Sequence, residues 1–559
     1  MSSVLLSSAQ AGALDTEVSA QWGLHPFALV EAAGRACAQA FVSFYHTRVK
    51  QDISSHHGEI MRNEGAAVAA LGVRNGKTLF ENRFFYHHAQ IADRNSIPHS
   101  SFLIPNSYIV LAGKGNNAAD ALVMLRALIL NEYADPAACR VLCVQEISLA
   151  DNEKTPLSEA MRAVRMLGVT ISAWNTGAAD ALAAADIVID GIAGTGLKGP
   201  LRDTALEMVN ALNEPDQPLV VSIDIPSGNF DGWQPGMSIV NADLTLAIEP
   251  QKLCIYTPAA RPFAGTIIPV KGIFPSIPTG RYREAELVEW ESAALAIPPV
   301  PQTAHKYQRG LVEIRAGSPG AGGAAKLAAL GAQAAGAGLV RLIVDSSLYP
   351  LIASGCTGIM AAPDENTEHG RFAPDAVLLG PGWGRGEDRQ RIFERYCVCE
   401  EQGLPLILDA DAIALARDTV FHGNVVMTPH AGEFAAYTGI PINVILNDPV
   451  PILRQYAAEK QVHILFKSHV LYAMSPEGRI GIIDGMNPAL AAGGSGDVLA
   501  GFCAAIAARL KPFDGFTCMC AAASLLIQAA KTEALANTFF DPADLAKAAA
   551  AIAGKAWLH

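Results

Sequence analysis

The chain has 559 residues, of which 50% are hydrophobic and 17% are charged. At about 150 residues per domain this length predicts two to four domains, and the apolar content excludes an intrinsically disordered chain. The 41 lysines and arginines are outnumbered by 54 acids, which gives a net charge of −13 without any basic run, so we expect no nucleic-acid partner.

The spacing of the cysteines and the length of the apolar runs indicate the cellular compartment of the protein. The ten cysteines include no Cys-x-x-Cys pair, which fits neither a disulfide scaffold nor a structural zinc site. The first residues carry no basic region, and no later window reaches the roughly 18 uninterrupted apolar residues that cross a bilayer. We therefore expect a cytoplasmic protein without a signal peptide or a membrane anchor.

From Ser107 onward, short β-branched runs alternate with stretches rich in alanine and leucine. This alternation is typical of a parallel α/β sheet that is covered by helices on both faces. The strands expected in this first series are residues 107–113, 140–145, 170–174, 187–190 and 219–225. Helices are expected between them, over 118–130 and 158–167.

A proline-rich stretch at residues 274–303 separates this series from a second one. Its prolines are incompatible with central strands and helix interiors. Beyond it, strands are expected at 311–314, 339–345, 376–379, 405–409, 424–427 and 462–466, and helices at 497–510, 518–535 and 542–554. The sequence therefore predicts two tandem α/β domains, residues 1–275 and 303–559, joined by a linker at 276–302.

A segment without a clear period, residues 51–97, interrupts the first domain. Its histidine pairs, His56-His57 and His87-His88, could belong to a metal-binding loop, but adjacent histidines without further ligands favour a surface insertion. The run GVRNGKT at residues 72–78 is one residue short of a P-loop, and the spacing decides which amides reach a phosphate. We assign no function to this segment.

Three loops of the first domain each follow the carboxyl end of an expected strand, where open α/β sheets bind ligands. The first, residues 112–120, opens a helix, matches the loose dinucleotide fingerprint G-x-G-x-x-A and can bind an anion. The others are residues 190–200 and 224–228. Together they offer glycine-rich amides, a lysine and the oxygens of Asn117 and Asp190, which suit a phosphate-bearing substrate and a hard cation. For any single aspartate, a cap or turn is the alternative.

These loops, together with Glu31-Ala-Ala-Gly-Arg35, resemble the epimerase family that acts on the hydrated nicotinamide dinucleotides NADHX and NADPHX. The resemblance covers about the first 275 residues and implies a Rossmann-like three-layer αβα sandwich. It implies that Asp224 transfers protons and that potassium is held by Asn117, Asp190 and Ser227. The substrate contacts that it implies are Asn116, Asn117, Asp120, Gly194, Thr195, Gly196 and Lys198.

Two alanines depart from the pattern of this family, because its Gly-Gly-Asp-Gly is Ala-Ala-Asp-Ala at residues 118–121. Each added methyl group would narrow the approach of a phosphate, and where a glycine needs positive φ an alanine costs on the order of 1 kcal/mol or more. The Leu-Asp that usually follows Pro-Ser-Gly is Asn229-Phe230. The sequence leaves open whether the first half is an active epimerase or a non-catalytic nucleotide-binding domain.

The second half carries one prominent motif, AAGGSGDVLAG at residues 491–501. Glycines and a serine before an apolar helix form an amide nest at a positive helix end, and Asp497 lies in the first turn. This arrangement suits phosphoryl transfer, because amides neutralise charge on the phosphoryl oxygens while a carboxylate takes the proton of the attacking hydroxyl. A glycine-rich turn with a helix-favouring aspartate is the alternative.

Four further motifs accompany it, at residues 305–310 (HKYQRG), 380–384 (GPGWG), 409–411 (DAD) and 428–434 (TPHAGEF). In order and spacing they resemble the ribokinase-like dehydratase family, which removes water from NAD(P)HX at the expense of a nucleotide. The resemblance runs from about Thr303 to the C-terminus. It implies phosphorylation of the C6 hydroxyl of the S epimer, followed by expulsion of phosphate with electrons from the ring nitrogen.

This second resemblance implies residue roles as well. Asp497 is the expected base, and a substrate specificity for the S epimer explains a fused epimerase. The other substrate contacts implied are Ala324, Gly382 and His430, although a lone histidine can also be structural. ADP or ATP, with Mg²⁺, is the implied phosphate donor, and we expect ADP. Its implied contacts are Lys467, Ser468, His469, Val470, Leu471, Gly494 and Gly496.

Two other functions remain open at this point. A kinase for a hydroxymethyl vitamin precursor would use the same Asp497 motif, although the fused first half argues against it. An oxidoreductase would need an acid at the end of the next strand, where residues 140–145 supply none. The uncapped apolar helices at the C-terminus lead us to expect a homo-oligomer.

Overall fold

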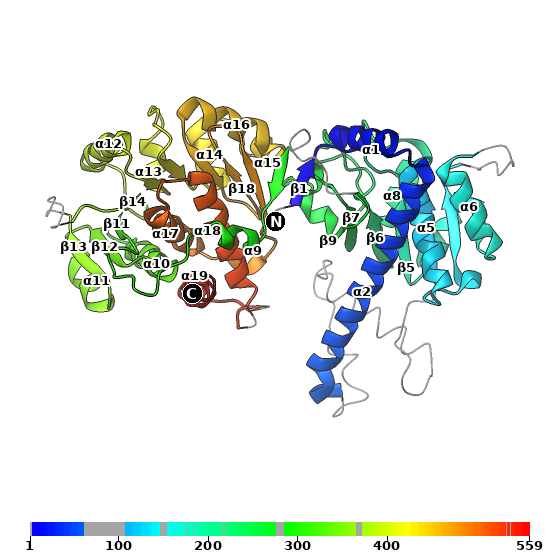
Figure 1. Cartoon of the computed structure of the whole chain (residues 1–559), viewed down its shortest axis with the longest axis horizontal. Helices are drawn as coiled ribbons and strands as arrows, with labels where there is room; N and C mark the ends of the chain where they lie inside the picture. Colours follow the sequence, from blue (N-terminus) through cyan, green and yellow to red (C-terminus); the bar gives the residue numbers. More distant parts are fainter. Residues whose placement is uncertain are drawn as a thin grey trace. The chain divides into compact units, whose positions relative to one another are not determined.

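The computed structural model describes residues 3–60, 107–145, 154–175, 177–183, 185–215, 218–274, 284–364, 372–532, 534–536 and 538–558. The chain forms two compact units, Leu5–Glu284 and Met1–Val4 with Ala285–His559 (Figure 1). The expected segment 51–97 falls largely outside the described residues, apart from the backbone of 51–60, which is helical.

The division between the units falls inside the expected linker, 276–302. Residues from Ala285 onward already belong to the second unit, because β10 (Ala285–Leu287) pairs with β19 (Ile480–Asp484) and is followed by α9 (Trp290–Leu295). The linker is therefore shorter than we expected. Its second proline group follows α9 instead of preceding all regular structure.

The first unit contains a seven-stranded parallel sheet in the order β4-β3-β2-β5-β6-β7-β9. Its strands are β2 (Tyr108–Ala112), β3 (Arg140–Cys143), β4 (Thr170–Ala173), β5 (Ile187–Gly191), β6 (Leu219–Ile223), β7 (Leu244–Ile248) and β9 (Thr266–Val270). The chain starts in the middle, runs to one edge and then returns past β2. The loops after β2 and β5 therefore diverge, which creates a topological switch point.

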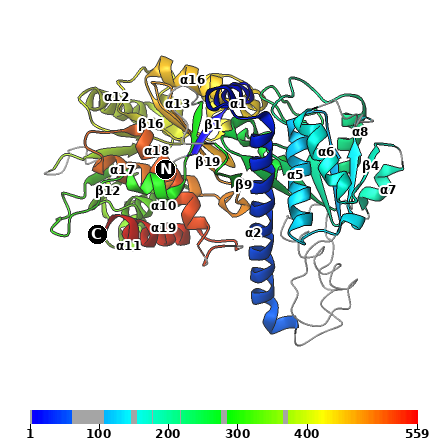
Figure 2. The same cartoon turned by 45° about the vertical axis from the view of Figure 1, so that its right-hand side comes forward.

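Helices cover both faces of this sheet. One apolar core contains α2 (Pro26–Ile60), α5 (Asn116–Leu130) and α6 (Pro156–Met166), and the other contains α7 (Ala178–Ala183) and α8 (Asp203–Leu212). Figure 2 shows α2 alongside α5. The two helices approach closely at Gly34, where a Cβ atom would lie 2.5 Å from Cβ of Val123.

A short pairing at the start of the first unit brings another helix to the sheet. Leu5 of β1 (Ser3–Leu6) pairs with Gln251 of β8 (Gln251–Lys252) in parallel. The helix that follows, α1 (Ser8–Trp22), begins with a Ser7 capping box, and both carboxylate oxygens of Asp231 accept a hydrogen bond from the N–H of Ser8. These contacts fix α1 near the carboxyl end of β7.

The second unit contains a sheet in the order β13-β12-β11-β14-β15-β16-β17-β18-β19-β10, in which β18 alone runs antiparallel to its two neighbours. The further strands are β11 (Leu311–Arg315), β12 (Leu339–Val344), β13 (Met360–Pro363), β14 (Ala376–Leu379), β15 (Leu406–Leu408), β16 (Val425–Met427), β17 (His463–Phe466) and β18 (Val470–Met474). After β10 at the edge, the chain continues from β11 in the middle of the sheet, with a switch point between β11 and β14.

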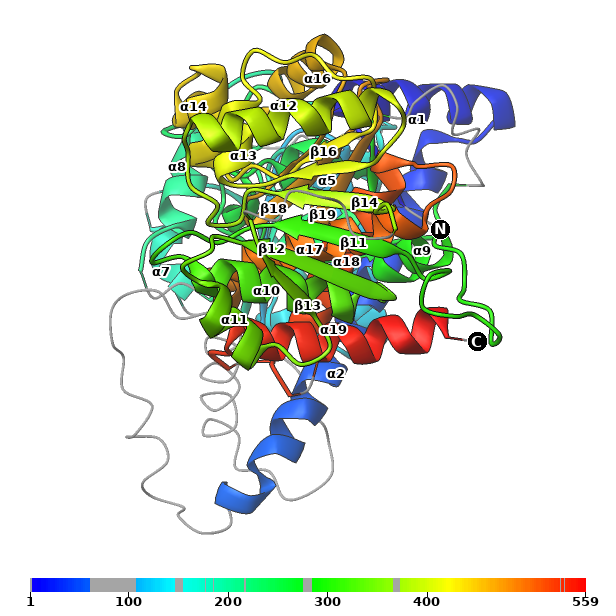
Figure 3. The ribbon, with the colours of Figure 1, turned by 90° about the vertical axis from the view of Figure 1, so that its left-hand side faces the viewer.

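Helices cover both faces of this sheet too (Figure 3). One face carries α10 (Gly322–Ala334), α17 (Ser495–Arg509), α18 (Gly515–Ala530) and α19 (Pro542–Trp557), and the other carries α12 (Glu387–Glu401) and α16 (Pro449–Lys460). Small residues let α10 and α17 touch, since a Cβ at Gly501 would lie 2.2 Å from the carbonyl oxygen of Ala328. This contact holds the first turn of α17 in place.

The expectation of two tandem three-layer αβα domains is confirmed. In the described part of the chain, no helix combines the length and the apolarity needed to cross a bilayer.

Candidate functional site

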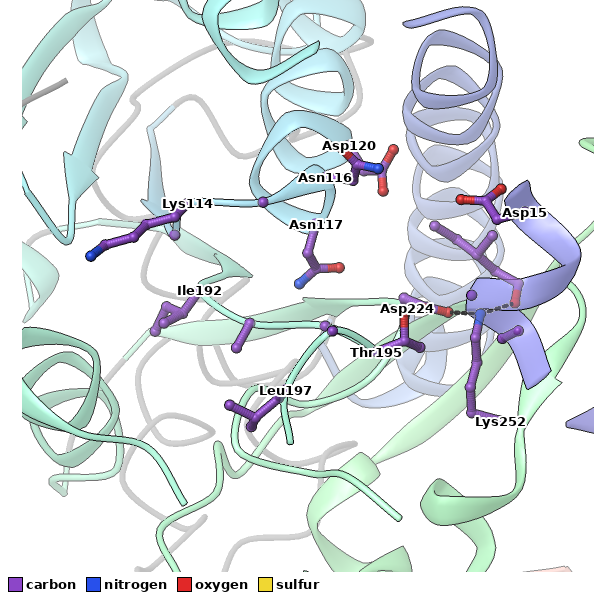
Figure 4. A pocket seen from close by; sticks show the side chains of 18 of the residues that line it. Asp15, Lys114, Asn116, Asn117, Asp120, Ile192, Thr195, Leu197, Asp224 and Lys252 are labelled. Carbon is purple, nitrogen blue, oxygen red and sulfur yellow. Dashed lines mark hydrogen bonds and ion pairs between the residues drawn. The ribbon is translucent and has the colours of Figure 1, made fainter. Parts of the chain in front are cut away.

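A cavity of about 770 Å³ lies at the carboxyl ends of the strands of the first unit (Figure 4). It is lined by the loop after β2, the loop after β5, Asp224 after β6 and the first turns of α1. The first two loops flank the switch point, so the cavity occupies the place where this fold binds ligands. Six expected substrate residues line it: Asn116, Asn117, Asp120, Gly194, Thr195 and Gly196.

The loop after β2 is shaped for an anion. Gly113 has to be glycine, because a Cβ there would lie 1.8 Å from the carbonyl oxygen of Ile192. Gly115 is the N-cap of α5 and offers no side chain to bond the first N–H groups, which leaves them for a ligand. Asn116 and Asn117 follow as the first helical residues.

The two alanines that replace family glycines do not reach the cavity. Ala118 and Ala119 are fully buried within α5, have no positive φ and do not line the cavity. Gly191 supplies the space for this packing, since a Cβ there would lie 3.3 Å from Cα of Ala118. The expectation that the added methyl groups narrow the approach of a phosphate is therefore wrong.

Lys198 is placed differently from our expectation. Its side chain is exposed and does not line the cavity, although Leu197 and Pro200 on either side of it do. Positive charge comes instead from Lys114, Arg202 and Lys252, all of which line the cavity.

Asp190 and Ser227, two of the expected potassium ligands, lie together in the fully buried layer at the strand ends. Ser227 donates its Oγ–H to Asp190 Oδ1 (2.5 Å) and its N–H to Oδ2 (2.9 Å), and Ser222 Oγ donates to Oδ2 (2.7 Å). Burial raises the pKa of Asp190, and these hydrogen bonds oppose that effect. Among the described residues, no cationic side chain pairs with this carboxylate.

Asn117, the third expected ligand, lines the cavity and hydrogen-bonds neither partner. Its side-chain Nδ2 is buried without a hydrogen-bond partner among the described residues. The structure thus brings Asp190 and Ser227 into contact and leaves one polar end of Asn117 free.

Asp224, the expected proton-transfer residue, forms a buried ion pair that the sequence did not reveal. Lys252 Nζ lies 2.6 Å from Asp224 Oδ1 and also donates to the carbonyl oxygen of Ile248 at 3.1 Å. Asp15 of α1 lines the same part of the cavity (Figure 4). Burial raises its pKa, the charge of Lys252 opposes this, and the charge of Asp224 adds to it.

Asp497 is the centre of a second site, in the second unit. It lies in the first turn of α17, three residues after the N-cap Gly494, whose φ of 106° is in the left-handed region. Burial and the charges of Asp409 and Glu433 raise the pKa of Asp497 to about 6, while Lys467 opposes them. Its carboxylate makes no hydrogen bond to a described residue, so it is open to a substrate hydroxyl.

Lys467 is held beside this carboxylate by its own ion pair. Its Nζ lies 2.7 Å from Oδ1 of Asp409, which also accepts a hydrogen bond from Thr428 Oγ1 at 2.7 Å. Gly496 approaches Lys467 closely, since a Cβ there would lie 3.3 Å from Nζ. The expected nucleotide contacts Lys467, Gly494 and Gly496 are therefore neighbours of the expected base.

The remaining expected residues of the second unit fall into two groups. Gly382 lies against α10, where its Cβ would be 3.2 Å from Cβ of Ala324, so these two substrate residues are adjacent. The backbone of His430 forms an isolated parallel β-bridge with that of Lys467. Its side chain caps α14 (Ala431–Thr438), where Nδ1 accepts a hydrogen bond from the N–H of Gly432 at 3.0 Å.

The expected nucleotide segment after β17 is only partly accessible. Ser468 and His469 lie in the turn before β18, where the carbonyl oxygen of His469 accepts from the N–H of Gly485. Val470 and Leu471 are buried in β18. Among the described residues, no group of three histidine, cysteine, aspartate or glutamate side chains is suited to holding a metal ion.

Two family models match this chain, one in each of its two units. The family model described as YjeF-related protein N-terminus matches residues 86–254, and the model described as NAD(P)H-hydrate dehydratase matches residues 312–551. A crystal structure of the ADP/ATP-dependent NAD(P)H-hydrate dehydratase from Bacillus subtilis, co-crystallized with ATP/Mg²⁺, is similar at 26% identity and a TM-score of 0.44. It covers 48% of this chain, and the match spans 99% of that one.

Two parallel α/β units, each with glycine-rich loops and an aspartate at the carboxyl ends of its strands, define a two-domain nucleotide-binding enzyme. The bifunctional NAD(P)H-hydrate repair enzyme Nnr of Moorella thermoacetica is 30% identical over 426 residues, 72% of this chain and 79% of that one. The enzyme of the same name from Escherichia coli is 28% identical over 497 residues, 85% of this chain and 90% of that one. The chain belongs to the family of bifunctional NAD(P)H-hydrate repair enzymes.

Proposed function

We propose that the chain repairs hydrated nicotinamide cofactors in two steps. The first unit converts R-NAD(P)HX to the S epimer, and the second unit dehydrates S-NAD(P)HX to NAD(P)H at the expense of ADP or ATP. The observation that carries the proposal is the cluster in the second unit, where Asp497 is partly buried, makes no hydrogen bond to a described residue and lies beside Lys467 and the amides of α17.

In the dehydratase step, Asp497 accepts the proton of the C6 hydroxyl as that oxygen attacks the terminal phosphoryl group of the nucleotide. With a pKa of about 6 the carboxylate is largely ionised at neutral pH, yet basic enough to take a proton. Lys467 and the N–H groups that follow Gly494 face the phosphoryl oxygens. Phosphate then leaves C6 with electrons supplied by the ring nitrogen, and a proton is lost from C5, so that the C5=C6 double bond of NAD(P)H forms.

In the epimerase step, the amides at the start of α5 and Lys114 hold the phosphates of the dinucleotide, and Thr195 and Gly196 close over it. Asp224 is the proton-transfer group at the ring. Its ion pair with Lys252 fixes the direction in which the carboxyl group points.

Potassium fits the first unit, and we propose that Asn117, Asp190 and Ser227 hold it. The atoms that would bind the ion are oxygens. The Asp190 carboxylate is buried and accepts hydrogen bonds only from neutral groups among the described residues. Rotation of the Asn117 amide by half a turn would place its oxygen where Nδ2 lies free. The ion would supply the positive charge that a buried carboxylate and an anionic substrate both need.

The nucleotide brings Mg²⁺ with it in this proposal, and ADP is the expected donor. We also propose a homo-oligomer, although α18 and α19, whose apolar sequences led to that expectation, are capped by Asp514 and Asp541 and bury apolar side chains in the core of the second unit. A cytoplasmic setting is supported by the ten free cysteines.

Two alternatives are weaker. A vitamin-precursor kinase would share the Asp497 cluster but gives no role to the cavity of the first unit. A non-catalytic first unit was suggested by Ala118 and Ala119, and both lie away from the cavity.

The test of the second unit supplies pure S-NADHX with ADP or with ATP, and Mg²⁺, and follows the absorbance of NADH. NADH formation with either donor is the expected result. A phosphorylated product without NADH would favour the alternative of a small-molecule kinase. If neither donor gave a reaction, the dehydratase assignment would be wrong.

A further inference from the structure

Asp120 is a buried carboxyl group in the cavity of the first unit, and one of its oxygens has no hydrogen-bond partner among the described residues. It lies in the second turn of α5, lines the cavity and is only 8% exposed. Its Oδ1 is buried and has no hydrogen-bond partner, and no cationic side chain pairs with it among the described residues. An unpartnered buried carboxylate costs stability unless it carries a proton, so this residue needs an explanation other than folding.

The surroundings of Asp120 favour its neutral form. The ionisable groups that face it are Asp224 at the end of β6, Asp15 of α1, Lys252 of β8 and the buried thiol of Cys37 on α2. Burial raises the pKa of Asp120 well above its usual range, the charges of Asp224 and Asp15 add to this, and Lys252 opposes them.

Two carboxyl groups in one cavity therefore differ in their partners. Asp224 pairs with the ammonium group of Lys252, whereas Asp120 has no cationic partner among the described residues. Two acids in such different environments are the arrangement expected of a general base and a general acid.

The reaction requires both. In the hydrated ring the hydroxyl is carried by C6, which is bonded to the ring nitrogen. Inverting C6 by exchange of its hydroxyl requires the C6–O bond to break and a new one to form on the opposite face. Hydroxide is a poor leaving group, so a positioned acid has to protonate the oxygen as it leaves.

We propose that Asp120 is this acid: its carboxyl group protonates the departing C6 hydroxyl, and Asp224 takes the proton of the water that returns. The proposal rests on the epimerase function proposed above and adds a catalytic role to a residue expected only to bind substrate.

The step balances as follows. The proton of Asp120 moves to the C6 hydroxyl, the C6–O bond breaks with its electron pair on oxygen, and water leaves. The lone pair of the ring nitrogen forms a double bond to C6. A water molecule then adds to the opposite face, the double-bond pair returns to nitrogen, and the extra proton of the water passes to Asp224. Exchange with solvent in the open cavity returns both carboxyl groups to their starting states.

The test compares Asp120→Asn with wild type in the full chain, with R-NADHX as substrate and separated epimers as the readout. The asparagine keeps the size of the side chain but cannot give up a proton. We expect kcat for R-to-S conversion to fall at least about 100-fold, the scale of general acid catalysis, while KM changes less than about threefold. The matched control Asp135→Asn keeps its capping oxygen at η1 (Pro136–Ala138), outside the cavity, and should convert R-NADHX normally.

Dehydration of S-NADHX by the same preparations reports the second unit, and thermal melting of the variant, expected at or above the wild-type temperature, reports the folding of the first. A second measurement needs no variant: wild-type R-to-S turnover should fall as pH rises through the pKa of Asp120, while S dehydration does not follow that profile.

Retained kcat in Asp120→Asn, an effect on KM alone, or no alkaline decline in wild type would overturn the role of Asp120 and leave the epimerase assignment intact. Failure of wild type to convert R-NADHX would instead overturn the epimerase assignment, and this inference with it.

Discussion

Substituting Asp497 by asparagine separates catalysis from folding in the second unit. The side chain keeps its shape at the first turn of α17 but no longer accepts a proton. General base catalysis contributes about 100-fold to 10,000-fold, so turnover of S-NADHX should fall by that factor. In wild type, activity should rise with pH through about 6, because the carboxylate has to be ionised.

The same substitution should stabilise the chain. The pKa of Asp497 is raised in the folded state from 3.8 to about 6, so above pH 6 the folded protein holds a charge that it disfavours. This cost is fully present above pH 6, shrinks as pH falls below 6 and is gone below about 3.8. The difference in pKa corresponds to at most about 3 kcal/mol, because the side chain stays partly exposed.

The assay measures NADH formation from S-NADHX between pH 5 and 9, together with thermal melting at pH 8 and pH 5. We expect Asp497→Asn to be nearly inactive and to melt above wild type at pH 8, with a smaller difference at pH 5. Retention of more than a tenth of the activity, or a lower melting temperature at pH 8, would refute the reasoning.

Three further substitutions test the first unit. Lys252→Met leaves Asp224 buried and unpaired, so thermal melting should show a loss of stability of about 3–5 kcal/mol. The variant should also lose the conversion of R-NADHX while it still dehydrates S-NADHX. Normal conversion of R-NADHX would contradict the role of the ion pair. Gly34→Ala places a Cβ against α5 and should cost about 1–3 kcal/mol in denaturant unfolding, whereas Gly199→Ala, which meets nothing within 4 Å, should cost none; equal effects would count against the close helix contact. Ala118→Gly should lose about 1 kcal/mol of stability and leave R turnover unchanged, and faster turnover would show that its methyl group obstructs the substrate.

The central strands of both sheets were predictable because they are continuous apolar runs, each followed by a helical stretch. β7 was missed although its sequence, LTLAI, is equally apolar. No helix separates it from β6, so the alternation that identified the other strands is broken there. β9 was missed because it lies at the sheet edge and contains Pro269, which edge strands tolerate.

The candidate site was predictable where a loop follows a strand of the sheet, since strand ends meet at one edge whatever the loop contains. Asn117 and Asp224 were found in this way. Lys252 and Asp15 were not, because their approach to Asp224 depends on the pairing of β1 with β8, a contact between segments far apart in the chain. Lys198 was misplaced because proximity in a loop does not decide which way a side chain turns.

Conversion of R-NADHX to NADH tests the central claim most directly, because it requires both units of one chain. Pure R-NADHX is supplied with ADP or ATP and Mg²⁺, and the absorbance of NADH is followed for wild type and for Asp224→Asn. We predict rapid, complete conversion by wild type and slow conversion by the variant, with equal rates when S-NADHX is supplied. Equal rates from R-NADHX, or no NADH from either epimer, would contradict the account.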